Sequence, residues 1–326
     1  MAHARRLRLA FRPAPIRAAT AVALVALALT GCAELPASGA PAPEPGPAAL
    51  PEPAPIGASP ASAALRARFA QIAAQLQAQG LLRTDSRPPD APFSAAQLAE
   101  NFIAIALYDE YLSRGGAIVA RQSPAPLRRW ETPVRMNIEF GASVPLAQRR
   151  LDRITIASTA ARLARASGHP VTVDERAPNF TVMVLNEDER RAIGPRLAAL
   201  VPGIDPAAVR AVTGLAPTTF CVVFAFSEGR ERGYSRAIAV IRGEHPDILR
   251  QSCFHEELAQ GMGLANDSRR ARPSIFNDDE EFALLTRHDE LLLRILYDPR
   301  LRPGMTEAEA RPIVTTIANE LIGGSS

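Results

Sequence analysis

Residues 253–267 read Cys-Phe-His-Glu-Glu-Leu-Ala-Gln-Gly-Met-Gly-Leu-Ala-Asn-Asp, and this stretch decides both the expected fold and the expected site. Its first half has helical spacing, because Glu256 and Gln260 lie four residues apart and therefore share one face, with Glu257 beside them. Gly263 is expected to end the helix. Two adjacent glutamates ahead of an amide indicate a polar site, although solvated surface glutamates would produce the same pattern.

The segments on either side predict an α+β fold. Strands are expected where apolar residues alternate or run together, at 134–140, 171–173, 180–185, 220–226 and 237–241. Helices are expected from the 3.6-residue period at 62–79, 94–114 and 145–166, and in stretches up to about 212. Strands that alternate with helices imply a mixed, twisted sheet covered by long helices, followed here by a mostly helical C-terminal part.

The quoted stretch resembles the zinc-binding motif of metzincin-type metallopeptidases, H-E-x-x-H-x-x-G-x-x-H. In that motif two histidines on a helix bind zinc and the glutamate is the general base. Aligned without gaps, Glu256, Gln260 and Asn266 occupy the three histidine positions, and Glu257 occupies the position of the base. Asp267 matches the acid that often follows the motif. The resemblance implies a zincin-like fold with degenerate ligand positions.

The likeness continues downstream and covers about residues 130–300. Residues 274–277 resemble the Met-turn of the family, with Phe276 in place of methionine, and residues 285–297 resemble its closing helix. A closer likeness is to an uncharacterised domain of proteobacterial envelope proteins, whose function is unknown. The segments that carry this second likeness are 102–111, Arg129-Trp130-x-x-Pro133-Val134-Arg135 and Leu296-Tyr297-Asp298-Pro299.

The substitutions argue against a conventional zinc centre. Zinc is held by imidazole, thiolate or carboxylate, whereas carboxamide oxygens are weak ligands, so only Glu256 is a good donor among the three ligand positions. His255 does not restore the motif, because Ala259 stands four residues later and His255 points about 100° away from Glu256. We expect His255 to pack or hydrogen-bond beside the site. No cofactor is the main expectation, and a divalent cation is the alternative.

Three functions are compatible with these residues. The preferred one is a relict site that binds a peptide or protein at the sheet edge without zinc-dependent cleavage. The second is a divergent metallopeptidase that uses Glu257 as general base with a non-standard metal site. In the third, Glu256 or Glu257 activates water without a metal and the Gln260 amide stabilises the oxyanion.

The N-terminal residues predict export and anchoring. Residues 1–31 read as a signal peptide, with five arginines before an apolar core at 18–29. The sequence Leu29-Thr30-Gly31-Cys32 resembles the lipobox of bacterial lipoproteins, which implies lipidation of Cys32, and Ala33 favours the outer membrane, facing the periplasm. We expect a Pro/Ala-rich tether at 32–62, a helical N-terminal segment at 63–128 and the zincin-like domain at 129–326.

Charge and cysteine usage narrow the partners further. After residue 31 the chain carries 32 arginines against 34 acids and has no basic stripe, so a nucleic-acid partner is not expected. The expected partners are the membrane, through Cys32, and an unidentified peptide or protein. The other two cysteines, Cys221 and Cys253, predict a disulfide if the compartment is oxidising, and two buried thiols otherwise.

Overall fold

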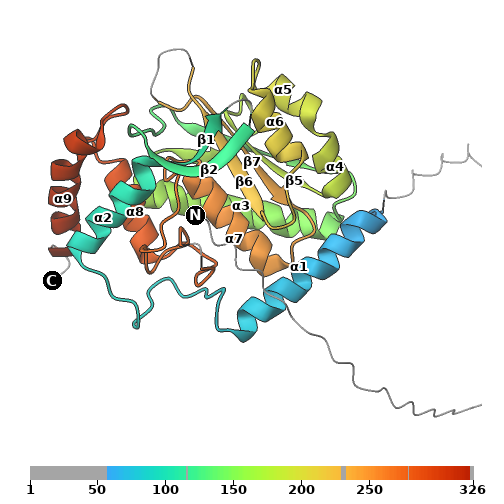
Figure 1. Ribbon diagram of the computed structural model, residues 1–326, viewed down its shortest axis with the longest axis horizontal. Helices are drawn as coiled ribbons and strands as arrows, with labels where there is room; N and C mark the ends of the chain where they lie inside the picture. Colours follow the sequence, from blue (N-terminus) through green and yellow to red (C-terminus); the bar gives the residue numbers. More distant parts are fainter. Residues whose placement is uncertain (1–56, 115–116, 229–232, 278, 324–326) are drawn as a thin grey trace, which may run out of the picture. The chain divides into compact units, whose positions relative to one another are not determined.

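A five-stranded mixed sheet lies at the centre of the fold (Figure 1). The structure is a computed structural model, and it describes residues 57–114, 117–228, 233–277 and 279–323. The strand order is β4-β3-β5-β7-β6, in which β6 runs antiparallel to β7 and the other neighbours are parallel. The five strands are β3 (Val134–Phe140), β4 (Val171–Val173), β5 (Phe180–Leu185), β6 (Cys221–Phe226) and β7 (Arg236–Arg242). The predicted mixed sheet with helices is confirmed.

Helices cover both faces of this sheet. On one face lie α3 (Leu146–Ser167) and α7 (Asp247–Gln260), whose Ile156 and Phe254 belong to the same buried apolar core as Val182 of β5. On the other face, α5 (Gly194–Leu200) and α6 (Pro206–Thr213) follow the short α4 (Glu187–Ala192), and Leu197 packs near Met183. Buried apolar side chains on both faces explain why the central strands β5 and β7 are almost uniformly apolar in sequence.

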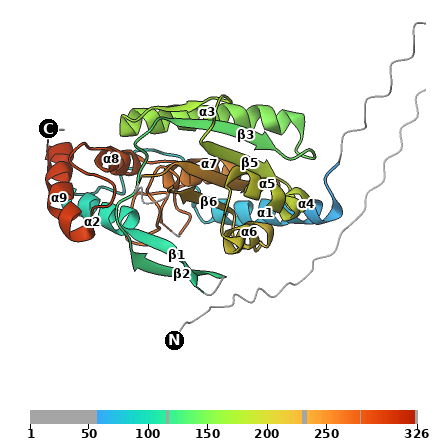
Figure 2. The ribbon, with the colours of Figure 1, turned by 90° about the horizontal axis from the view of Figure 1, so that it is seen from above.

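The segment before the sheet is not wholly helical, and the predicted helix at 94–114 is wrong in its second half. After α1 (Pro60–Ala78), α2 ends at Ala106 (Ala95–Ala106), and β1 (Tyr108–Arg114) pairs antiparallel with β2 (Ala117–Pro124). Backbone pairing between two segments close in sequence thus replaces the expected last turns of helix. The Gly-Gly pair at 115–116 is a sequence signal for a hairpin, and the prediction from helical periodicity did not use it. Figure 2 shows the hairpin beside α6, outside the larger sheet.

The C-terminal part contributes α8 (Arg287–Leu296) and α9 (Glu307–Gly323), which gather with α2 (Figure 1). Leu98 and Phe102 of α2 are fully buried in the same core as Trp130 and the sheet residues, so α2 is part of this packing unit. None of the helices in the described ranges is long and apolar enough to cross a membrane. The predicted signal peptide, most of the tether and Cys32 lie outside the described residues.

Candidate functional site

A cavity of about 750 Å³ lies along the edge strand β6, and we call it the cleft. Strand β6 contributes Cys221 to Ala225, α6 contributes small side chains, and α7 contributes Glu256, Glu257 and Gln260. The chain reaches this geometry because β7 leads directly through residues 243–246 into α7, so that α7 packs back against β7 and its antiparallel neighbour β6. The cleft therefore lies where the edge of the sheet meets the polar face of α7.

Helical spacing brings three of the residues singled out from the sequence to this cleft, and the loop after α7 brings a fourth. Glu256, Glu257, Gln260 and Asp267 all line it. Glu257 is buried, with 4% of its surface exposed, whereas Glu256 and Gln260 are half-buried. The Gln260 Nε2 donates a hydrogen bond of 3.2 Å to Asp267 Oδ1, so the end of α7 and the loop after it are joined at the cleft wall.

Asn266 does not join them. Its side chain is 2% exposed, and Nδ2 donates to the carbonyl oxygen of Ala104 at 2.7 Å, while its backbone N–H donates to the carbonyl oxygen of Ile105 at 3.1 Å. Asn266 does not line the cleft. The position equivalent to the third zinc ligand thus ties this loop to the end of α2, where the Asn266 amide gives a carbonyl oxygen of the last helical turn a hydrogen-bond partner.

His255 faces away from the cleft. It is buried, and its Nδ1 accepts a hydrogen bond of 3.1 Å from the backbone N–H of Leu285. Burial, assisted by the charge of Arg162, lowers the pKa of His255 to about 4, so the ring is neutral at pH 7. Its observed contacts are those of a packing and hydrogen-bonding residue.

The turn that contains Phe276 is fastened to the start of α8. Asp289 Oδ1 accepts a hydrogen bond from Ser274 Oγ at 2.5 Å, and Oδ2 accepts from the Ile275 N–H at 3.2 Å and from the Thr286 N–H at 2.7 Å. Thr286 and Asp289 form a capping box at the N-terminus of α8. Phe276 is fully buried in the core and does not line the cleft.

A disulfide joins the two walls of the cleft. Cys221 at the start of β6 is bonded to Cys253 of α7 with an S–S distance of 2.02 Å, which confirms the predicted pairing. Because Cys253 lies three and four residues before Glu256 and Glu257, the bond is on the same side of α7 as the two carboxylates. The Cys221 sulfur and one oxygen of each glutamate all lie within 4.8 Å of one another.

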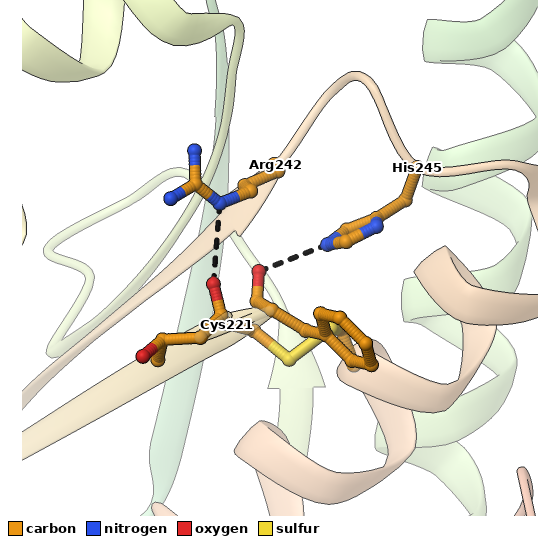
Figure 3. Close-up of a disulfide and its surroundings, with 6 residues drawn as sticks. Cys221, Arg242 and His245 are labelled. Atoms are coloured by element: carbon orange, nitrogen blue, oxygen red, sulfur yellow. Dashed lines mark hydrogen bonds between the residues drawn. A yellow bond between two sulfur atoms is a disulfide. The ribbon is translucent and has the colours of Figure 1, made fainter. Parts of the chain in front are cut away.

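The entry to β6 is held in place by Arg242 at the end of β7 and by His245 in the loop that follows, as Figure 3 shows. Arg242 Nε donates to the carbonyl oxygen of Thr219 at 3.2 Å, and His245 Nε2 lies 2.9 Å from the carbonyl oxygen of Phe220. Burial lowers the pKa of His245 to about 3, so the neutral ring donates through Nε2 to this carbonyl. Cys221 is therefore positioned by its neighbours as well as by its own disulfide.

Asp109, Arg128 and Tyr234 are among the cleft residues that were not expected from the sequence. Asp109 forms an ion pair with Arg128. Tyr234 also lines the cleft, and burial raises its pKa, partly opposed by the charge of Arg128. The predicted helix over 94–114 hid Asp109, which in fact lies in the β1 strand. Tyr234 forms an isolated β-bridge with Trp130, and Arg128 lies two residues before Trp130. This pairing joins residues that are far apart in sequence.

The ligand set of a metzincin does not fit zinc here. Gln260 donates its amide to Asp267, Asn266 is turned toward α2, and only Glu256 offers a strong donor at the three aligned positions. Cys221, Glu256 and Glu257 are close enough to share an ion, but a disulfide sulfur is not a thiolate, so the oxidised group supplies two carboxylates only.

Fold and site together define a mixed α/β protein with a carboxylate-lined cleft beside the edge strand of its sheet. The chain belongs to the family described as "Protein of unknown function (DUF2927)", whose model matches residues 95–316. This membership is consistent with the predicted likeness to an uncharacterised domain, and it carries no information about metzincins. Comparisons with curated proteins and with solved structures give no match.

Proposed function

We propose that the chain is a binding protein of the cell envelope, which holds an extended segment of a peptide or protein along β6 without zinc-dependent cleavage. The observation that carries this proposal is the place of β6. Within the described residues β6 pairs only with β7, and its other edge faces the cleft, which Cys221 to Ala225 line.

An edge strand is suited to this role. Its outward N–H and C=O groups offer a ready ladder to a partner strand, and main-chain pairing supplies affinity without a metal. The residues of β6 after Cys221 are half-buried rather than covered. Val223 and Ala225 add apolar surface next to α7, so an added strand would bury its alternate side chains in the cleft.

The charge of the cleft favours a cationic ligand. Among the described lining residues six are carboxylates and one is a guanidinium, that of Arg128; the acids are Asp109, Asp205, Glu256, Glu257, Asp267 and Glu280. Charges in a partly enclosed site interact more strongly than in bulk water, so arginine or lysine side chains would be attracted and acidic ones repelled. We therefore expect the ligand to be an extended segment that contains basic residues.

Two further features support the wider proposal. The antiparallel edge strand beside the glutamate helix, together with the turn that Asp289 holds, supports a zincin-like origin for the fold. The lipobox-like Leu29-Thr30-Gly31-Cys32 supports a lipid anchor in the outer membrane, facing the periplasm. The metallopeptidase alternative is supported by the buried Glu257 at the cleft wall, and it requires ligands that the observed side-chain contacts do not provide.

The test is selection from a library of extended peptides on the purified full chain, followed by affinity measurement and mass spectrometry of the recovered peptides. Thr218 is exposed at the cleft, and Thr172 is exposed on β4 at the opposite edge of the sheet. Thr218→Trp, which obstructs the cleft, should weaken binding at least ~10-fold, whereas the matched Thr172→Trp should leave it unchanged.

The effect of peptide charge and a test for peptide cleavage distinguish the binding protein from the metallopeptidase. Glu256→Gln should weaken binding of basic peptides more than that of neutral ones, and the loss should shrink at high salt. Equal effects of the two tryptophan variants would refute binding along β6. Recovery of cleaved peptides whose formation stops in Glu257→Gln would establish the metallopeptidase alternative instead.

A further inference from the structure

The disulfide and the two glutamates occupy one patch of the cleft wall. Cys221 lines the cleft and is 9% exposed, whereas Cys253 is 2% exposed and is covered by the core, so Cys221 is the more accessible of the two cysteines. The carboxylates of Glu256 and Glu257 approach the Cys221 sulfur to within 4.8 Å. In the oxidised chain the sulfurs are bonded to each other and cannot bind a metal.

We propose that reduction of the Cys221–Cys253 disulfide creates a binding site for a thiophilic divalent cation, such as zinc, with Cys221, Cys253, Glu256 and Glu257 as its ligands. This set differs from the one that the metzincin alignment would use. It also does not depend on the proposed peptide binding.

The spacing suits four-coordinate zinc. Zn–S distances of about 2.3 Å and Zn–O distances of about 2.0–2.2 Å place tetrahedral ligand atoms roughly 3.4–3.8 Å apart. The observed separations of up to 4.8 Å among the Cys221 sulfur and the two carboxylates require shifts of about 1 Å, which side-chain rotation supplies. Cys253, three and four residues before the glutamates on α7, adds its sulfur from the same side.

The backbone around Cys221 has supports besides the disulfide. Cys221 is paired with Ile241 of β7, and the two residues before it are held through their carbonyl oxygens by Arg242 and His245 (Figure 3). Cys253 lies inside α7, whose position is set by core packing. Reduction thus leaves two thiols facing each other across a gap that a metal ion would fill.

A dithiol can reduce the Cys221–Cys253 disulfide in two steps. Its thiolate attacks the Cys221 sulfur, the S–S bond breaks, and Cys253 leaves as a thiolate that takes up a proton. The second thiol of the reductant then resolves the mixed disulfide, which yields Cys221 as a thiol and the oxidised, cyclic reductant. Binding of the divalent cation displaces one proton from each cysteine to solvent.

The experiment uses the full chain carrying Cys32→Ser, so that only the two cysteines of the disulfide remain. One sample is reduced with a phosphine and desalted without oxygen, and a second is kept oxidised. Both are titrated with Co²⁺, whose thiolate charge-transfer absorption reports sulfur ligation, and then with Zn²⁺ as competitor. We expect one Co²⁺ per reduced chain with charge-transfer absorption, its displacement by Zn²⁺, and no such absorption from the oxidised chain.

Variants of the carboxylates decide whether the folded site is responsible. In the reduced chain, Glu256→Gln combined with Glu257→Gln should weaken zinc binding at least ~10-fold. The matched Glu175→Gln, at an exposed glutamate away from the cleft, should change it less than twofold. Unchanged affinity in the double variant would overturn the proposal, since binding by thiols in an unfolded chain would not need the carboxylates. Absence of binding by the reduced chain, or equal binding by the oxidised chain, would also overturn it.

Discussion

Replacing Asp289 tests how the buried turn at 274–277 is held. Its carboxylate is fully buried and accepts hydrogen bonds from Ser274 Oγ, the Ile275 N–H and the Thr286 N–H. Asp289→Ala leaves these three donors without an acceptor. Hydrogen bonds to a charged group contribute about 1.5–3 kcal/mol each, and part of the loss is offset because a buried charge is removed, so we expect the free energy of unfolding to fall by about 4–5 kcal/mol.

Two further variants give a graded series of expected losses in the free energy of unfolding. Asp289→Asn keeps one acceptor oxygen and loses the charge, so it should cost about 2 kcal/mol. Glu290→Ala, at the next position of α8, removes a partly exposed ion pair with Arg162 and should cost less than about 1 kcal/mol. Urea unfolding followed by circular dichroism measures all three. If Asp289→Ala costs no more than Glu290→Ala, the turn is not held by this carboxylate and the reasoning fails.

Three further predictions concern stability. Cys221→Ser with Cys253→Ser should lower the free energy of unfolding by about 3.5–4 kcal/mol, because the disulfide closes a loop of 32 residues; urea unfolding measures this. His255 has a pKa of about 4 in the folded chain and about 6.5 when unfolded. The free energy of unfolding is therefore unaffected by His255 above pH 6.5 and falls by about 1.4 kcal/mol per pH unit from pH 6.5 down to pH 4, because only the unfolded chain takes up the proton there. Unfolding at several pH values measures this. Arg250→Met should cost about 3–5 kcal/mol in the same unfolding assay, because it leaves the buried Asp152 carboxylate without its partner at 2.6 Å.

Each of these has a control in the same chain. For the disulfide, a reductant should have no effect on the double serine variant. For His255, His255→Gln should reduce the acid slope by about 1.4 kcal/mol per pH unit, and an unchanged slope would contradict the assignment. For Arg250, the exposed Arg153 lies 3.9 Å from Glu175, and Arg153→Met should cost less than about 0.5 kcal/mol; equal losses would contradict a burial-dependent effect.

Local residue patterns were sufficient for much of the fold. The strands at 134–140 and 180–185 were predicted with their observed bounds, because alternation and unbroken apolar runs reflect one-sided and two-sided burial. The helix predicted at 145–166 is observed as α3, which ends at Gly168 in the left-handed conformation, φ 72°. The shared cleft face of Glu256 and Gln260 followed from their spacing on a single helix.

Only the tertiary structure decided the rest, because the partners are distant in sequence. The amide of Asn266 is directed to Ala104 across 162 residues, and no spacing within 253–267 encodes that contact. The same holds for Arg128, which precedes β3, and Tyr234, which lies between β6 and β7. It holds also for β1, where pairing with β2 displaced a helical pattern. Short-range periodicity determines which face of an element is buried, whereas the packing of whole elements determines which polar side chains meet.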